Sequence, residues 1–342
     1  MRASSCALFL LIASPLVADT LTGEEVLDGL NVSESDRRAL ESGEILAYDG
    51  EEYEGNDRDL SADALVLVDR SLDEVVAHVR DVDSIIPQKY LVDNADIETL
   101  EDFATVGYTV DEIEEADKLL NAKRSKDLNL SDGEIAMLAQ ARASARDLDD
   151  AGRAAAASDA IRKILIARYQ SYLESGLNGI PEYQRSKKKA INVGEDLALT
   201  TETFEPFEPD FPEYYRTMRN FPDGMDCCEH VFRWLKVNFR KRPAFALSHT
   251  FFRKTDDMLI ITERHYYVTH TINSVQVTVS WLPYDENTYM GLAVSASTDI
   301  LDSVMGRALR PLGRNKAREM VSDVLGVMRT EVQEPDEDLA PD

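Results

Sequence analysis

The stretch from Pro243 to Thr298 constrains the fold more than any other part of the sequence. Four segments rich in Val, Ile, Thr, Tyr and Phe follow one another there, with only short polar turns between them. The turn from Lys254 to Asp257 is typical of a hairpin between the first two segments. The sequence therefore predicts an antiparallel sheet on which most of the helical chain packs. The four segments are residues 244–253, 258–270, 274–282 and 288–297.

The composition is that of an acidic globular protein. Asp and Glu number 64 against 37 Lys and Arg, which gives a formal net charge of −27 over 342 residues. Such a charge opposes binding to nucleic acids or to anionic lipid surfaces through a broad patch. The 44% of hydrophobic residues are sufficient for a sizeable core. We therefore expect a folded protein without a nucleic-acid partner.

The N-terminus has the pattern of a signal peptide. Arg2 precedes an apolar run from Cys6 to Ala18, which is too short to span a bilayer. Leu16 and Ala18 suit the positions that precede a cleavage site before Asp19. We expect residues 1–18 to be removed and the mature protein to be periplasmic or extracellular, with no transmembrane segment.

Two adjacent cysteines, Cys227 and Cys228, remain after the expected cleavage. Adjacent cysteines seldom bond to each other because the ring that they close distorts the peptide, so reduced thiols and a vicinal disulfide are both open. His230 lies nearby, but no second pair of ligands has the spacing of a zinc site. No nucleotide-binding glycine motif occurs either, and we expect neither a metal nor a cofactor.

The rest of the chain divides into helical and strand-like segments around the sheet. Residues 19–84 are expected to form short helices, first strands and a helix opened by the capping pair Ser71 and Glu74. Residues 85–229 are expected to be a mainly helical insertion or lid, in which Ser158 caps a helix that ends at Gly176. Within it, residues 203–215 alternate aromatic, acidic and proline residues and predict an irregular loop.

The third part, residues 230–333, contains the sheet and two flanking helices. Asp226 to Phe239 is interpreted as a helix before the sheet, and Arg314 to Thr330 as a long helix after it. The second helix carries apolar residues at i, i+3, i+4 and i+7 spacing, which predicts a face buried on the sheet. Residues 334–342 are acidic and are expected to be disordered.

This order of elements resembles the START-like (SRPBCC, helix-grip) fold, an α+β fold in which a curved antiparallel sheet grips a long C-terminal helix. A local resemblance to a family of exported bacterial proteins rests on Phe232, Trp234, Lys236, Phe239, Pro243, His249 and the stretch ending at His270. The helix-grip resemblance implies a cavity between sheet and C-terminal helix that holds a lipid or another apolar ligand.

The candidate ligand-binding residues come from the alternation of side chains along the predicted strands. If Arg253 pairs with Met258, His249 lies on the same side of the sheet as Arg264, Tyr266 and His270. Glu263, His265, Tyr267 and Thr269 are expected on the other face. The aromatic residues Trp281 and Tyr289 complete the set of ligand-binding candidates.

These residues are compatible with three functions. The first is binding of an apolar or amphipathic small molecule, possibly a lipid, oriented by the polar face. The second is a hydrolase or cyclase that uses His249, Arg264 and His270, and the third is a structural or interaction protein of the cell envelope. Partly exposed sheet residues or hydrogen-bonded core histidines would explain the same pattern without any site. Oligomeric state does not follow from the sequence.

Overall fold

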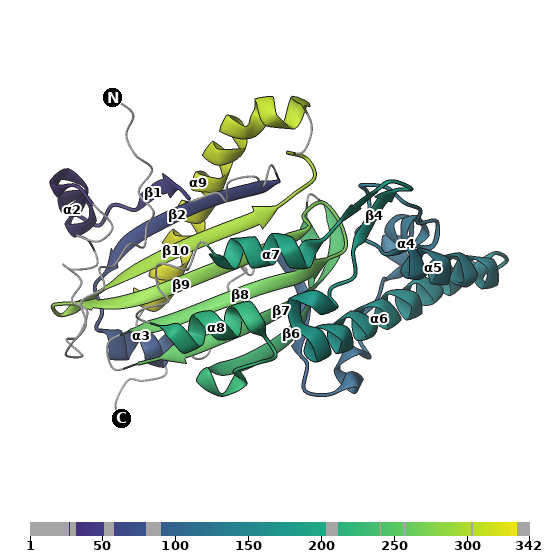
Figure 1. Ribbon diagram of the computed structural model, residues 1–342, viewed down its shortest axis with the longest axis horizontal. Helices are drawn as coiled ribbons and strands as arrows, with labels where there is room; N and C mark the ends of the chain where they lie inside the picture. Colours follow the sequence, from purple (N-terminus) through teal and green to yellow (C-terminus); the bar gives the residue numbers. More distant parts are fainter. Residues whose placement is uncertain are drawn as a thin grey trace.

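The computed structural model describes residues 27, 32–50, 58–79, 90–202, 211–239, 241–255, 258–301 and 304–333. These residues form an α+β fold around one eight-stranded antiparallel sheet with the strand order β1-β2-β10-β9-β8-β7-β6-β3 (Figure 1). The strands are β1 (Leu46–Asp49), β2 (Asp59–Val68), β3 (Leu91–Asp96), β6 (Glu229–Phe239), β7 (Arg242–Lys254), β8 (Leu259–Val268), β9 (Ser274–Tyr284) and β10 (Asn287–Ser297).

The helices follow the same chain order. They are α2 (Glu34–Glu41), α3 (Leu72–Val79), α4 (Ile113–Leu120), α5 (Asp132–Ala145), α6 (Asp150–Ser175), α7 (Val193–Glu202), α8 (Pro212–Asn220) and α9 (Val304–Gln333). A separate hairpin consists of β4 (Tyr183–Ser186) and β5 (Lys189–Ile191). Within the described ranges, no helix is both long and apolar enough to cross a membrane.

The predicted meander is confirmed, since β7, β8, β9 and β10 pair in sequence order. Asp285 lies in the tight turn between β9 and β10 with φ 51°, a left-handed conformation that Asp tolerates better than most residues. The register at the first hairpin differs by two residues from the expected one, because Arg253 pairs with Ile260. A shift of two preserves the face, so His249 and Arg264 are direct cross-strand partners.

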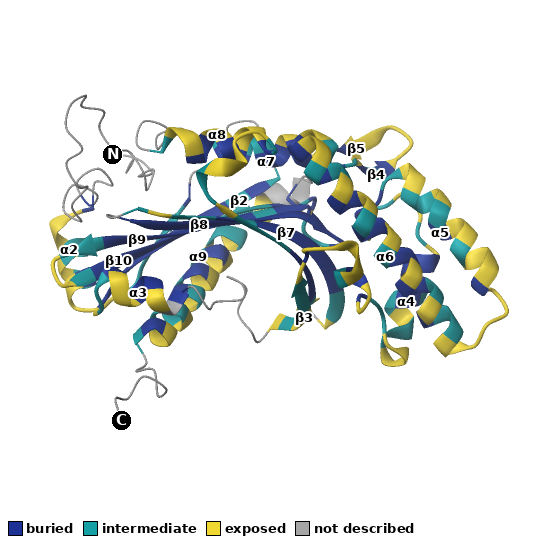
Figure 2. Ribbon diagram, turned by 90° about the horizontal axis from the view of Figure 1, so that it is seen from below, coloured by how far each residue is buried: buried dark blue, intermediate teal, exposed yellow. Residues whose placement is uncertain are grey.

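Helices cover the two faces of the sheet (Figure 2). We call the side covered by α9 and α3 the α9 face, and the side covered by α7 and α8 the α8 face. The core of the α9 face joins Val321 and Leu325 of α9 to alternate residues of β2, β8, β9 and β10. The apolar stripe of the C-terminal helix is therefore buried on the sheet as its spacing predicts, although Met320 is exposed.

The helices α4, α5 and α6 form a lobe beside the β6 end of the sheet, together with the β4–β5 hairpin (Figure 1). The capping pair Ser131 and Glu134 opens α5. Ser158 does not cap a helix as expected: it lies inside α6, whose N-cap is Asp149. The Ser158 hydroxyl instead donates to the carbonyl of Ala154 and accepts from the backbone N–H of Tyr108.

Two other predicted elements differ from the structure. Residues 229–239, expected to be helical, form the strand β6, which pairs with β7 across a turn at Lys241 with φ 65°. The insertion also contributes β3, which pairs with β6 at the sheet edge. Residues 212–215, expected to be irregular, begin α8, because Pro212 occupies the first helical turn, where a missing N–H costs nothing. The signal peptide 1–18, the tail 334–342 and residues 203–210 of the expected loop lie outside the described residues.

Candidate functional site

A line of hydrogen-bonded side chains crosses the α8 face. It starts at Arg264 on β8, whose Nη1 lies 3.5 Å from the hydroxyl of Tyr172 on α6. The Tyr172 hydroxyl lies 3.0 Å from Nδ1 of His249 on β7, and Nε2 of His249 lies 2.8 Å from Nδ1 of His230 on β6. Nε2 of His230 lies 3.0 Å from the carbonyl oxygen of Met225. The line thus runs from the sheet interior to a half-buried histidine.

The direction of every hydrogen bond in this line follows from its last acceptor. A carbonyl oxygen only accepts, so Nε2 of His230 carries a proton that it donates to Met225. Nδ1 of neutral His230 must then accept from Nε2–H of His249, whose Nδ1 accepts from the Tyr172 hydroxyl. Tyr172 oxygen in turn accepts from Arg264. With both histidines neutral, every hydrogen bond of the line is satisfied without an external group.

The pKa shifts agree with this assignment. Burial lowers the pKa of His249 well below its usual value, and electrostatic repulsion from Arg264 and from a proton shared with His230 adds to this effect. Burial also lowers the pKa of His230, although its bond to the Met225 carbonyl opposes the shift. A proton on either ring would break a hydrogen bond in which that ring accepts.

We expect this line to make stability depend on pH. The folded pKa of His249 lies below its unfolded value of about 6.5, so the unfolded chain takes up a proton first as pH falls. The contribution is complete above about pH 6.5 and is lost below it, by up to about 1.4 kcal/mol per pH unit. Denaturant unfolding between about pH 7.5 and pH 5.5 should show a shallower slope for His249→Gln than for the wild type. Equal slopes would refute the assignment.

Arg264 is a buried cation whose hydrogen-bond partners are neutral. Its guanidinium donates to the side chains of Gln276 and Thr201 and to the carbonyl of Met218, in addition to Tyr172. These acceptors belong to β9, α6, α7 and α8. The Arg264 guanidinium therefore connects these helices to the α8 face of the sheet through hydrogen bonds.

The cysteines lie at the outer end of the line. Cys227 and Cys228 are free thiols whose sulfurs are 2.7 Å apart, and the sulfur of Cys228 is 3.6 Å from Nε2 of His230. Burial, followed by the neighbouring thiol of Cys227, raises the pKa of Cys228, which opposes formation of a thiolate there. Within the described ranges, no group of three or more His, Cys, Asp and Glu residues is placed to hold a metal ion.

The structure brings three of the six predicted site residues together. Tyr172 stacks on Tyr266 with ring centroids 3.9 Å apart, and it contacts His249 and Arg264 as described. His270 is not part of this group, because its ring contacts Thr271 and the carbonyl of Pro243. The set His249, Arg264 and His270 therefore does not meet at one point.

A bulge in β8 explains the position of His270. Leu247 pairs with Tyr267 and Ser248 with His265, so Tyr266 is an extra residue without a cross-strand partner. Both Tyr266 and Tyr267 belong to the core on the α8 face, and the alternation of faces is inverted beyond them. Alternation extrapolated through a bulge places every later residue on the wrong face.

The two remaining predicted site residues lie on opposite faces. Trp281 is fully buried in the core between the sheet and α9, and its Nε1 has no hydrogen-bond partner among the described residues. Tyr289 is buried in a core of the α8 face, with its ring 4.6 Å from that of Tyr284. Trp281 alone of the six predicted residues belongs to the core that α9 covers.

The α9 face contains a buried polar group of its own. Nε2 of His265 lies 2.8 Å from Oε1 of Glu263, and these side chains are only 9% and 1% exposed. Ser248 is the direct cross-strand partner of His265 and so shares its face. Its hydroxyl is buried and has no hydrogen-bond partner in the described part of the chain. Nδ1 of His265 likewise has no partner among the described residues.

Sequence reasoning placed Glu263 and His265 on the same face but did not select them. The available signal was a carboxylate and a histidine two residues apart in a strand that is otherwise apolar and aromatic except for Thr262 and Arg264. Two ionisable residues on one buried strand face need each other as partners. Comparison with protein-family models, curated proteins and solved structures finds no match to the chain.

Proposed function

We propose that this protein binds an apolar or amphipathic small molecule, possibly a lipid, on the α9 face of its sheet, as an exported helix-grip protein of START-like type. The observation that carries the proposal is the buried pair Glu263 and His265 on the face that also forms the α9 core. Apolar side chains supply the area for a hydrocarbon portion, and the pair supplies an orienting polar group.

Two unsatisfied polar atoms are consistent with this location, although the buried hydroxyls of Tyr266, Tyr267 and Tyr289 on the α8 face also lack partners within the described residues. A buried donor or acceptor without a partner costs about 1–3 kcal/mol, so such atoms are rare unless a ligand or water completes them. The Ser248 hydroxyl and the Trp281 Nε1 are buried and lack partners within the described residues, and both lie on the α9 face. A ligand hydroxyl could donate to Nδ1 of His265, whose Nε2 is bonded to Glu263.

The proposal predicts that ligand occupancy depends on His265 and not on His249. Native mass spectrometry of the purified full chain, followed by solvent extraction, should detect a bound molecule of a few hundred daltons. His265→Gln should reduce its occupancy about tenfold, because one polar contact of about 1.4 kcal/mol is lost.

His249→Gln is the matched control, since it makes the same substitution on the opposite face of the same sheet. It should retain the ligand at wild-type occupancy in every preparation that remains folded by circular dichroism. Absence of any extractable molecule from the wild type, or equal loss in both variants, would contradict the proposal.

A second candidate function is hydrolysis, and it rests on one observation. Ser248, His265 and Glu263 lie side by side on the α9 face in the order of a nucleophile, a base and an orienting acid. The His265 ring is already held by the carboxylate, while the Ser248 hydroxyl has no competing partner among the described residues. Labelling of the wild type by a fluorophosphonate, abolished in Ser248→Ala, would favour catalysis over binding. If Ser248 is not labelled in protein that contains the ligand, hydrolysis is excluded and only the binding function remains.

A further inference from the structure

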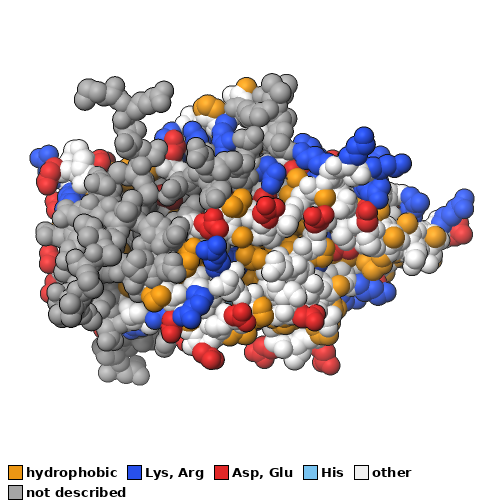
Figure 3. All heavy atoms as spheres, in the orientation of Figure 1, with side chains coloured by type: hydrophobic (Ala, Val, Ile, Leu, Met, Phe, Trp, Pro, Cys, Tyr) orange, Lys and Arg blue, Asp and Glu red, His pale blue; other side chains and the backbone are white. Residues whose placement is uncertain are grey.

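A depression on the helical lobe has a local excess of positively charged residues in its lining, whereas the chain as a whole is strongly negative. Its volume is about 610 Å³, and it lies between the loop after α4, the first turns of α5 and the β4–β5 hairpin. Four of its lining residues are cationic and one is acidic: Lys123, Arg124, Arg185, Lys187 and Asp132. Figure 3 shows Lys and Arg side chains gathered over the hairpin end of the molecule. In a chain of net charge −27, this local positive charge needs an explanation.

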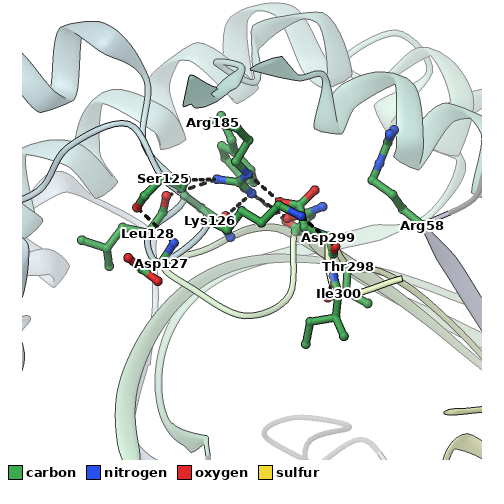
Figure 4. A network of polar contacts seen from close by, with 12 residues as sticks. Arg58, Ser125, Lys126, Asp127, Leu128, Arg185, Thr298, Asp299 and Ile300 are labelled. Atoms are coloured by element: carbon green, nitrogen blue, oxygen red, sulfur yellow. Dashed lines mark hydrogen bonds and ion pairs between the residues drawn. The ribbon is translucent and has the colours of Figure 1, made fainter. Parts of the chain in front are cut away.

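The two arginines are already paired. Arg124 donates through Nε and Nη2 to the two carboxylate oxygens of Asp132, at 2.6 and 2.8 Å. Arg185 is buried and donates to Asp299 and to several neutral acceptors beneath the depression (Figure 4). Neither guanidinium is free to neutralise an incoming anion without giving up these contacts.

The two lysines are different. Lys123 and Lys187 are exposed, and their ammonium groups have no ion-pair or hydrogen-bond partner among the described residues. They come from different elements, the loop after α4 and the β4–β5 turn, so they line the depression from separate segments. The hydroxyl-bearing Ser186 lies beside Lys187 in the same lining.

The remaining lining is apolar. Ile135, Ala136 and Ala139 of α5 face the depression, and the two alanines are exposed. A volume of this size falls in the range of small-molecule sites, which combine an apolar lining with a few polar groups. Two free ammonium groups match a doubly charged anion better than a single carboxylate.

We propose that this depression binds a phosphomonoester whose organic part is apolar. The phosphate dianion, with a second pKa of about 6, is held by Lys123 and Lys187, and the organic part lies on Ile135 and Ala139 of α5. The site is independent of the ligand proposed for the α9 face, because it contains none of the same residues. Its phosphate ligand also differs from that ligand in charge.

Phenyl phosphate is the probe, titrated into the full-length protein by isothermal calorimetry at low salt. We expect saturable binding at one site, and weaker binding as the ionic strength rises from about 50 to about 300 mM. Lys123→Gln/Lys187→Gln should weaken binding about tenfold or more, because both free charges are removed. Lys163→Gln, which removes an exposed charge from α6 outside the depression, should retain the wild-type affinity.

A second variant separates shape from charge. Ala139→Trp fills the depression from an exposed position of α5 without changing any charge, and it should abolish binding of phenyl phosphate. Inorganic phosphate and benzyl alcohol should each bind at least about tenfold more weakly than phenyl phosphate. The inference is wrong if phenyl phosphate shows no saturable binding, or if inorganic phosphate binds as tightly as phenyl phosphate. It is also wrong if Lys163→Gln weakens binding as much as the double lysine variant does, or if the protein binds only anionic vesicles.

Discussion

Replacing Arg185 by Met should lower the free energy of unfolding by about 3–5 kcal/mol, the cost of breaking a buried ion pair by removing one partner. Arg185 and Asp299 are only 3% and 8% exposed, and Nε lies 2.5 Å from the carboxylate. The same guanidinium donates to the side-chain oxygens of Asn129 and Asn273. Its removal leaves an unpaired buried carboxylate where the helical lobe meets the end of β10. Urea unfolding monitored by circular dichroism measures the change.

Arg124→Met is the matched control, because Arg124 also forms an ion pair with an aspartate, but at the surface. Arg124 and Asp132 are 39% and 52% exposed, so their pair should contribute about 0–1 kcal/mol. If the two variants unfold at the same denaturant concentration, Arg185 does not join the lobe to the sheet as described.

Truncating Leu325 to Ala should destabilise the protein by about 2–5 kcal/mol, through lost burial and the cavity that it leaves. Leu325 is fully buried in the core between α9 and the sheet. Where the loss of stability falls within this range depends on how far α9 can move toward the sheet and fill the cavity after the truncation. Thermal and urea unfolding of the variant provide the measurement.

Met320→Ala on the same helix is the comparison that isolates burial from helix propensity. Met320 is 47% exposed, so its truncation should change stability by no more than about 0.5 kcal/mol. A Leu325→Ala variant as stable as Met320→Ala would mean that α9 does not pack on the sheet through this face.

Much of the architecture could be predicted from local patterns. The four strands β7 to β10 are recognisable because β-branched and aromatic residues alternate between short turns. The helix starts at Ser71 and Ser131 are recognisable because a hydroxyl and a carboxylate three residues apart satisfy each other's backbone N–H groups. These signals act within a few residues, so no knowledge of the fold is needed to interpret them.

The strand β6 was missed for a physical reason. Its sequence, EHVFRWLKVNF, places apolar residues at spacings compatible with either a helix or a strand, and a short run of this kind is ambiguous. The choice is made by pairing, since β6 bonds to β7 on one side and β3 on the other. Tertiary contacts override the local preference there. The turn at Lys241 also lacks the glycine or asparagine from which a hairpin turn can be predicted.

The candidate sites were only partly predictable. The placement of His249 and Arg264 on one face follows from alternation, but the bulge at Tyr266 depends on contacts that the strand alone does not encode. Which helix covers which face is also decided by long-range packing, so the group around Tyr172 could not be separated from the α9 face in advance. Glu263 and His265 were placed on one face, yet their burial became evident only with the fold.

The central claim is that the ligand lies on the α9 face, and photoaffinity mapping with a diazirine-bearing long-chain alcohol tests it most directly. Saturable cross-links should fall in peptides that contain residues 259–265, 277–281 and 317–325, and unlabelled alcohol should compete them away. Labelling confined to α7 and α8, or labelling that does not saturate, would contradict the claim.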